Sequence, residues 1–490
     1  MVFIELTPGV TWLTSSFIRV YFYNKVQKVY WTQEEKSTLD KYDVVVVGAG
    51  TAGCLAAKTV AEQGLKVCMI ENKKRADIGV KVCGDAMGEH HLTYLGLEKP
   101  QGGELEKRIE GVQIFSPDQG TVFTIADKDF IGYILNRRLF GQWLLKKATD
   151  KGAELMDSTR FLEPIVEKGF VTGAKVNNHA GENIELKSKV VVDASGFMAV
   201  VRHKLPEEMG IEREIENEDV EACYREIRQL KQENENTKYC EIYLDGKVTP
   251  GGYMWIFPKG GAKVNVGLGV VMRKKFPNPK KQLYDFVLPR HQFEGSLLLN
   301  AGAWWDPTRR PLDNMVGNGV VLVGDAASLV NPIHGGGIGP SMLSGFQAGK
   351  TIVEALEKGE PSREALWGYN NLYMGSYGKK QASLDIFRMF LVACSDADLN
   401  YGMNCKLITE GDVLKASMGN DFRLNITETA KRVFRGRKRM GFLKQLAYTV
   451  KMMREVRAHY ETYPTSPQNF EQWRQQTVNL IETGKKRLLY

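Results

Sequence analysis

The glycine turn at residues 48–53 has the residue types and spacing to hold a phosphate. Gly48 permits a tight turn, Gly50 lets the backbone approach a pyrophosphate, and Gly53 lets helix and strand pack closely. The amides and dipole of the helix that follows favour the phosphate charge. Glu71, after the next apolar strand, is spaced to take a ribose hydroxyl pair. The turn therefore predicts a dinucleotide site, and a tight turn without a ligand is the alternative. Its sequence is Gly48-Ala49-Gly50-Thr51-Ala52-Gly53.

A second glycine-rich segment follows a later apolar strand. Gly324 and Asp325 come directly after that strand, at the edge where ligands bind in open α/β sheets. The carboxylate can accept hydrogen bonds from a cofactor's sugar or ribityl hydroxyls, although aspartate is also a common helix N-cap. The next glycines offer consecutive amides at a helix start, a nest suited to the negative edge of a reduced flavin. The alternative is a flexible loop. These residues are Gly335, Gly336, Gly337 and Ile338.

Alternating aromatic residues mark a strand that can line an apolar cavity. Tyr253, Trp255 and Phe257 share one face of that strand, because side chains alternate along a strand. Burying a long apolar chain there is favourable by about 25 cal/mol per Å² removed from water. Gly267 and Gly269 leave room opposite, and an ordinary core face is the simpler interpretation. The full candidate set is Tyr253, Trp255, Phe257, Pro258, Gly267 and Gly269.

Cys83 lies in a short loop and has three open interpretations. Beside a redox cofactor its thiol can protonate a substrate carbon, form an adduct, or only pack as a small hydrophobe. His90, His91 and His334 are equally ambiguous. His334, within the second glycine segment, is the one expected to touch the cofactor.

The elements that position these residues form an interrupted domain. Dinucleotide signals at both ends enclose a strand-rich insert, so a doubly wound α/β domain is expected to be discontinuous in sequence. A helix is expected near residues 130–149 and another over 340–358, and the chain after residue 361 reads as helical. The expected division is an N-terminal extension over residues 1–40, a cofactor domain over 41–120, 125–207 and 300–358, a β-rich substrate domain over 208–299, and a helical region over 361–490.

Composition excludes several classes of protein. The 490 residues are 43% hydrophobic and 25% charged, as in globular proteins. The net charge of +8 is spread along the chain without a nucleic-acid module, so no nucleic-acid partner is expected. Seven cysteines without a C-x-x-C pair argue against metal centres. Whether Cys394 and Cys405 form a disulfide stays open, and a reducing interior is the simplest interpretation.

The chain carries no apolar run long enough to cross a bilayer. Residues 431–457 instead combine many lysines and arginines with apolar residues, the pattern of a basic amphipathic helix that can lie on anionic lipid. A solvated charged face is the usual alternative. Together these patterns predict a cytoplasmic protein, peripheral to the membrane.

Three of the motifs together resemble the FAD-binding set of the para-hydroxybenzoate hydroxylase class: residues 48–53, residues 193–196 and Gly324-Asp325. Within that class the chain resembles the geranylgeranyl reductase family. Residues 253–269 match its YxWxFPx₇₋₈GxG signature, which lines the prenyl cavity. The resemblance covers about residues 41–400. It looks closest to the archaeal enzymes that saturate geranylgeranyl chains of membrane ether lipids.

The resemblance implies FAD as the cofactor, in a Rossmann-type domain like that of glutathione reductase. The segment with Cys83, Gly84 and Asp85 is similar to the family's cysteine-glycine segment beside the flavin. Arg137 is expected near the FAD pyrophosphate, and Asp193 belongs to the FAD-binding set.

The implied reaction is reduction of isolated C=C bonds in geranylgeranyl groups, with Cys83 and Trp255 as candidate catalytic residues. Hydroxylases of this class carry an aspartate where this chain has Ser195, which leaves the external electron donor open between NAD(P)H and a ferredoxin-type protein. Trp255 can stabilise positive charge on a tertiary carbon by cation–π attraction. A flavin monooxygenase and a non-catalytic prenyl-binding protein are the alternatives.

Overall fold

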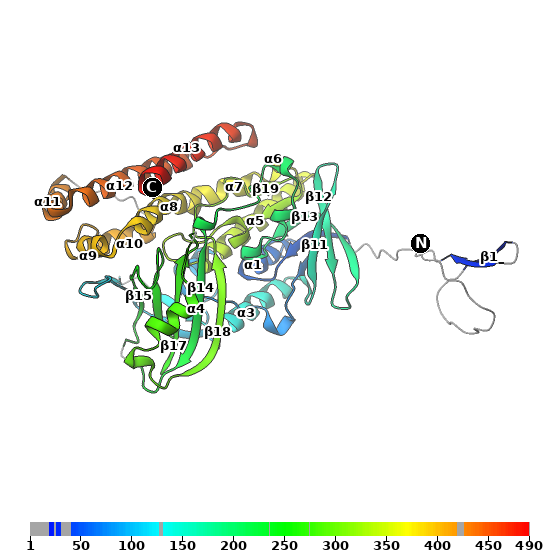
Figure 1. The fold of residues 1–490 in the computed structure, drawn as a ribbon. Helices are drawn as coiled ribbons and strands as arrows, with labels where there is room; N and C mark the ends of the chain where they lie inside the picture. Colours follow the sequence, from blue (N-terminus) through cyan, green and yellow to red (C-terminus); the bar gives the residue numbers. More distant parts are fainter. Residues whose placement is uncertain are drawn as a thin grey trace. The chain divides into compact units, whose positions relative to one another are not determined.

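In the computed structural model, the protein divides into two units, residues 1–40 and residues 41–490 (Figure 1). In the first unit the antiparallel hairpin β1 (Arg19–Tyr23) and β2 (Val26–Tyr30) is described. The second unit carries every motif discussed above. The described residues are 19–23, 26–30, 41–126, 131–234, 236–273, 275–418 and 426–489.

A parallel sheet ends at the glycine turn. Its strands follow the order β10-β4-β3-β13-β20, and each neighbouring pair is parallel. Residues 44–47 are at most 3% exposed, as expected for a strand covered on both faces. The bounds are β3 Lys41–Val47, β4 Val67–Ile70, β10 Glu154–Met156, β13 Asn183–Asp193 and β20 Val320–Leu322, with antiparallel additions β11 Arg160–Glu167, β12 Phe170–Asn177 and β19 Val316–Gly317.

Three helices and a small sheet pack around the parallel sheet, in the region expected to bind the cofactor. Helix α1 (Thr51–Ala61) packs against both α3 (Arg137–Thr149) and α5 (Ile338–Lys358). The helix expected from residue 130 begins only at Arg137. Asn136 caps it by accepting a hydrogen bond from the Leu139 amide at 3.2 Å, and a strand precedes it. That strand belongs to the three-stranded sheet of β5 Ala86–Gly88, β9 Gly132–Leu135 and β6 Leu105–Ile109, beside the short helix α2 His90–Tyr94.

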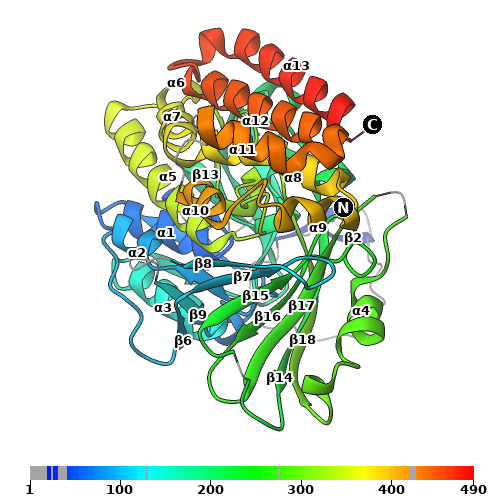
Figure 2. The same cartoon turned by 90° about the vertical axis from the view of Figure 1, so that its left-hand side faces the viewer.

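A seven-stranded sheet contains most of the region expected to be the substrate domain (Figure 2). Its order is β18-β14-β17-β16-β15-β7-β8, and the Lys259-Gly260-Gly261 turn joins β16 to β17 as the expected hairpin. Residues 111–120 and 125–126 were expected in the cofactor domain, but β7 pairs in parallel with β15, and β8 pairs with β7. The expected boundary at residue 300 falls inside β18. The bounds are β7 Gly111–Phe115, β8 Val122–Ala126, β14 Glu221–Gln229, β15 Tyr239–Tyr243, β16 Met254–Pro258, β17 Lys263–Val271 and β18 Leu297–Asp306, with α4 Pro279–Gln282.

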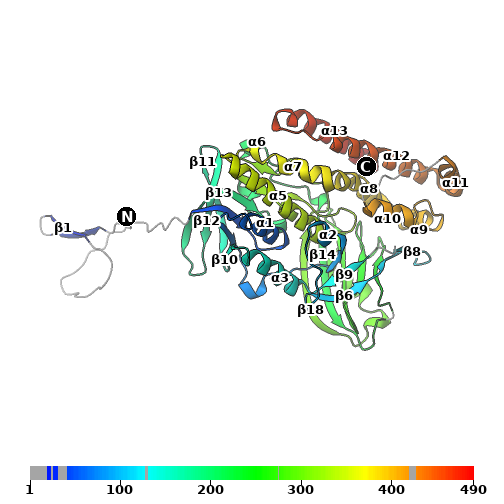
Figure 3. The same cartoon turned by 180° about the vertical axis from the view of Figure 1, so that it is seen from behind.

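The region after residue 361 is helical in its described part, as predicted (Figure 3). The basic segment 431–457 is broken between two helices by a 3₁₀ turn at Arg437–Arg439. None of the described helices is long and apolar enough to span a bilayer. Cys394 and Cys405 are free thiols. The helices are α6 Arg363–Leu366, α7 Gly368–Tyr373, α8 Lys379–Ala393, α9 Asp396–Asn404, α10 Glu410–Met418, α11 Ile426–Gly436, α12 Met440–Glu461 and α13 Phe470–Leu488.

Candidate active site

The three glycines of the first turn are needed for different structural reasons. Gly48 has φ +107° and donates its amide to the Ile70 carbonyl at 2.8 Å, a backbone state that favours glycine. A Cβ on Gly53 would collide with the Gly48 carbonyl oxygen. A Cβ on Gly50 would meet no heavy atom within 4 Å. Protein packing therefore requires glycine at 48 and 53, whereas at Gly50 the free space lies where a pyrophosphate is expected.

Arg137 faces the start of α1 with unused donors. Its Nη2 lies 3.4 Å from the Thr51 hydroxyl, while the buried Nε and Nη1 have no hydrogen-bond partner among the described residues. Unpaired buried guanidinium donors are costly unless a ligand takes them. Together with the open space at Gly50, they fit the phosphates of a dinucleotide.

Glu71 lies beside the turn, where a ribose was expected. Its carboxylate accepts hydrogen bonds from the amides of Ala49 and Lys73, each at 3.0 Å. These bonds hold the acid at the carboxyl end of β4, beside the turn. A carboxylate oxygen can accept more than one hydrogen bond, so ribose hydroxyls still find acceptors there.

Asp193 holds a loop beneath the site. It is fully buried, and its oxygens accept hydrogen bonds from the Ser195 amide and hydroxyl at 3.1 and 2.6 Å and from the Arg202 amide at 2.8 Å. The loop in turn packs on Gly48, whose added Cβ would lie 3.2 Å from the Ser195 Cα. Asp193 thus supports the turn through the backbone.

The second glycine segment faces the same region. Gly324 has φ +60°, and a Cβ added to it would lie 3.2 Å from the Ala52 Cβ. Asp325 is 5% exposed and pairs with the Lys81 ammonium at 2.6 Å. An added Cβ on Gly337 would lie 3.4 Å from the Asp325 carboxylate. The acid, its lysine and the glycine loop are therefore neighbours.

The glycine loop is tied to the aromatic strand. The Tyr253 hydroxyl donates to the His334 carbonyl at 2.7 Å. Gly335 adopts φ +61°, and its amide bonds the Asn331 carbonyl at 3.0 Å. Gly336 donates to the His334 ring at 3.1 Å, and Ile338 begins α5. These bonds join the predicted cofactor loop to the predicted substrate face.

The segment at residues 81–85 is fixed against the substrate sheet. An added Cβ on Gly84 would lie 2.8 Å from the Phe257 ring. Asp85, at φ +67°, accepts from the Lys259 ammonium at 2.6 Å and from the Asn265 amide at 2.9 Å. Asn265 also donates to the Cys83 carbonyl at 2.8 Å. This network sets the position of the cysteine.

Cys83 is half-buried, and burial raises the pKa of its thiol. At neutral pH it is a thiol, which favours proton donation or packing over nucleophilic attack. His91 packs against Gly339 at the start of α5. Burial lowers the pKa of His91 to about 3, so this imidazole is neutral at neutral pH.

The aromatic residues share one face, as predicted. Ring centroids are 6.0 Å apart for Tyr253 and Trp255 and 6.3 Å apart for Trp255 and Phe257. Position 267 requires glycine because the Trp255 indole lies over it, and a Cβ there would collide with the ring. The glycine therefore makes room for the tryptophan. Gly269 lies farther along, and Pro258 ends the strand in a buried position.

Sequence reasoning missed Asn265, Lys81 and Glu221. Asn265 is fully buried and accepts the Trp255 indole N–H at 2.9 Å. A polar residue inside the apolar run 264–271 was the available signal, because buried amides need partners. Lys81 gave no comparable signal, since its partner Asp325 is distant in the chain. Glu221 gave none either, because its burial depends on strands that are distant in the chain.

Two family models match this chain. The geranylgeranyl reductase catalytic domain matches residues 219–303, and the FAD dependent oxidoreductase model matches residues 43–249. The first range contains β14 to β17 and most of β18. The second contains the glycine turn, Arg137 and the loop after β13.

Curated relatives align along most of the chain. A digeranylgeranylglycerophospholipid reductase of Sulfolobus acidocaldarius is 41% identical over 91% of this chain and 99% of its own length. One of Methanothrix thermoacetophila is 35% identical over 78% of this chain and 95% of its own. Among solved structures, a geranylgeranyl bacteriochlorophyll reductase-like protein of Thermoplasma acidophilum is 25% identical with a TM-score of 0.72, covering 84% of this chain and 99% of that one.

Proposed function

Since the chain belongs to the digeranylgeranylglycerophospholipid reductase family, we propose that it saturates isolated C=C bonds of geranylgeranyl chains on archaeal-type ether glycerophospholipid precursors. It is an oxidoreductase of the FAD-dependent class. The observation that carries the proposal is that the matched catalytic domain contains the aromatic face, which contacts the segment at residues 81–85.

The chain's residues fit FAD along its length. Gly50 and the free donors of Arg137 receive the pyrophosphate, and Glu71 receives the adenosine ribose. Asp325 is available to ribityl hydroxyls, and the amides of residues 335–338 suit the pyrimidine edge. When bound, FAD supplies the hydride. The protein's part is to hold the cofactor and the alkene together without water.

The aromatic face receives the prenyl chain in this proposal. An isolated alkene has no carbonyl to polarise, so positive charge develops at a tertiary carbon during reduction. The Trp255 ring, held by its indole N–H on Asn265, can stabilise that charge by about 0.5–2 kcal/mol. Tyr253 and Phe257 extend the apolar wall, and Cys83 lies at its edge.

An external donor reduces the flavin, either NAD(P)H or a ferredoxin-type protein. Ser195 stands where hydroxylases of the class carry an aspartate, and its hydroxyl is used by Asp193. Supplying each donor to oxidised holoprotein under anaerobic conditions and following flavin bleaching identifies which one works.

The central test uses dithionite-reduced holoprotein, mixed anaerobically with a geranylgeranylated glycerophospholipid. We expect the lipid mass to rise by one pair of hydrogen atoms for each double bond reduced. Trp255→Ala should slow turnover while FAD stays bound. Trp305→Ala is the matched control, because this partly exposed tryptophan on β18 is opposite Ala222, on the other face of the sheet.

Two outcomes contradict the proposal. An oxygen-dependent product with no added hydrogen indicates a monooxygenase. A colourless protein that takes up no FAD but binds prenyl lipid indicates a non-catalytic prenyl carrier. Loss of flavin in Trp255→Ala contradicts the assignment of that residue to the substrate.

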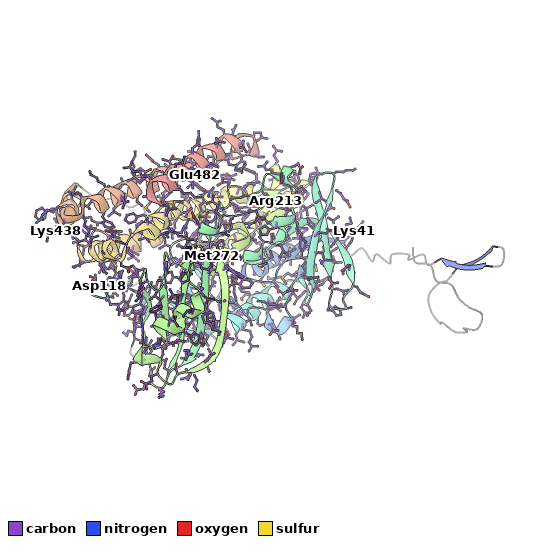
Figure 4. All side chains as sticks on the ribbon, in the orientation of Figure 1. Lys41, Asp118, Arg213, Met272, Lys438 and Glu482 are labelled. Atoms are coloured by element: carbon purple, nitrogen blue, oxygen red, sulfur yellow. The ribbon has the colours of Figure 1, made fainter. Side chains whose placement is uncertain are left out.

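Peripheral membrane contact at the tip of the helical region is part of this proposal, on the cytoplasmic side. Lys438 lies at that tip (Figure 4). Val433, Phe434 and Met440 are 49%, 66% and 48% exposed beside basic residues, a composition that suits anionic lipid. The apolar residues farther along the segment do not reach lipid, because Phe442, Leu446 and Met452 are buried in the core, with α12 packed on α8.

Sedimentation with vesicles tests the membrane contact. Phe434→Glu should lower binding to phosphatidylglycerol vesicles, and Val478→Glu on the separate helix α13 should not. Equal binding by both variants, or binding that does not depend on anionic lipid, contradicts the contact.

A further inference from the structure

Glu221 lies on the same sheet face as the signature glycines. It begins β14, between β17 and β18, opposite Val271 and Asp306. An added Cβ on Gly269 would lie 3.0 Å from the Glu221 Oε2 and 3.2 Å from the Cys223 sulfur. Since Gly267 on the same strand lies under Trp255, the carboxyl group shares the aromatic face proposed to receive the prenyl chain.

The Glu221 carboxyl is buried without a partner. It is 7% exposed, and no hydrogen bond or ion pair to it occurs among the described residues. The nearby Arg388 is engaged by Asp219 and Asp385 at 2.7 and 2.8 Å. Buried carboxyls without partners are costly to ionise. Such a group is either a local defect or is used by a ligand.

The surroundings keep this carboxyl protonated. Burial, and then the charge of Asp306 across the strand, raise the pKa of Glu221 to about 8, while Arg388 acts in the opposite direction. Tyr253 and Cys223 face it as neutral groups, because burial raises the pKa of each. At neutral pH Glu221 is therefore an acid with a proton to give, as general acid catalysis requires.

We propose that Glu221 is the acid that protonates the alkene carbon, an assignment that rests on the proposed reductase function. In the step, the π bond breaks and two C–H bonds form. One hydrogen arrives as hydride from the reduced flavin, and the other as a proton from the Glu221 carboxyl. The flavin is oxidised, and the carboxylate regains its proton from water. Asp306 is a positioning residue that keeps Glu221 neutral.

Cys83 is the competing proton donor. Its thiol lies in the segment at residues 81–85, whereas Glu221 lies on the sheet. Comparing Glu221→Gln with Cys83→Ser therefore separates the two groups. Glu163→Gln on β11 serves as the control for removing a carboxylate, because this glutamate is exposed and outside the site.

The first measurement needs no cofactor. Infrared difference spectra between wild type and Glu221→Gln, both without FAD at neutral pH, should show one protonated carboxylic acid band that the variant lacks. Glu163→Gln should keep it. Absence of that band in wild type means that the group is ionised and overturns the proposal.

The second measurement follows flavin oxidation by lipid in a single turnover. Glu221→Gln should slow this step at least about 100-fold with FAD affinity unchanged. The wild-type rate should fall at alkaline pH, and Asp306→Asn should move that fall to lower or unchanged pH but never higher. Glu221→Asp should restore part of the rate, which a purely structural role would not predict.

The outcomes separate the two proposals. Wild-type protein that saturates no lipid refutes the reductase function, and the acid role with it. Wild-type activity together with an unimpaired Glu221→Gln variant refutes only the acid role. If that variant does not fold, Glu221→Asp with wild-type rate and pH profile refutes it, and a loss confined to Cys83→Ser assigns the proton to the thiol.

Discussion

Replacing Gly50 by alanine should separate cofactor binding from folding. Gly50 is the N-cap of α1 with φ −78° and ψ −169°, a backbone state that alanine adopts without strain. The added methyl group meets no heavy atom of the protein within 4 Å. Gly53→Ala is the matched comparison, three residues along the same turn. There the new Cβ collides with the Gly48 carbonyl oxygen.

The expected magnitudes follow from these contacts. In the apoprotein, Gly50→Ala gains about 0.4–1 kcal/mol from the unfolded chain and loses a similar amount as a poorer N-cap, so the free energy of unfolding changes little. In the holoprotein, the methyl group holds the pyrophosphate away from the turn amides. Losing one hydrogen bond to a charged group costs about 1.5–3 kcal/mol, or about 10- to 150-fold in Kd. Gly53→Ala should destabilise the apoprotein by about 1–3 kcal/mol or more.

Urea denaturation of the two apoproteins and FAD titration by calorimetry measure these effects. Gly50→Ala should unfold like wild type and bind FAD weakly, whereas Gly53→Ala should unfold at lower urea. Wild-type FAD affinity in Gly50→Ala would show that the open space at this glycine is not the pyrophosphate site. Equal destabilisation by both variants would refute the packing argument.

Three further predictions follow from the substrate face. Gly267→Ala should displace the Trp255 ring and lower kcat/KM for lipid at least about tenfold, with FAD affinity unchanged by fluorescence titration; retained turnover would show that the ring position is unimportant. Asn265→Ala leaves the buried indole N–H unpaired and should lower the free energy of unfolding in urea by about 1–3 kcal/mol; wild-type stability in this variant would contradict the importance of that hydrogen bond. The raised pKa of Glu221, from 4.5 to about 8, means that the folded state holds this proton more tightly. The contribution of this proton to the free energy of unfolding is therefore fully present below about pH 4.5. It is lost as pH rises to about 8, by at most about 5 kcal/mol. In thermal melts, the melting temperature of Glu221→Gln should rise relative to that of wild type between about pH 5 and pH 9. A difference in melting temperature that does not change with pH would contradict this.

Local patterns in the sequence predicted the parts of the site that depend on short stretches of chain. The α/β fold with an inserted antiparallel sheet is confirmed, because strand length, glycine spacing and side-chain alternation act between near neighbours. The turn at residues 48–53 and the shared face of Tyr253, Trp255 and Phe257 are examples. The family resemblance is likewise confirmed by the relatives.

Contacts between distant segments were decided only by the tertiary structure. Residues 111–126 join the substrate sheet because β7 pairs with β15, more than one hundred residues later, and no local pattern specifies that partner. The basic segment after residue 431 was expected to present an amphipathic face to lipid. Arg432 is instead buried in an ion pair with Asp412, and Phe442, Leu446 and Met452 are buried as well.

The sequence by itself determined the glycine turn and the aromatic face of the strand, since these are properties of residue type and spacing, and from them it predicted where phosphate and an isoprenoid bind. The tertiary structure decided what surrounds them. It put Asn265 between Trp255 and the Cys83 segment, and it left Glu221 buried without a partner on the same face. A carboxyl's proton affinity depends on burial and on charges that come from other strands. Chemistry of that kind becomes visible only when the chain is folded.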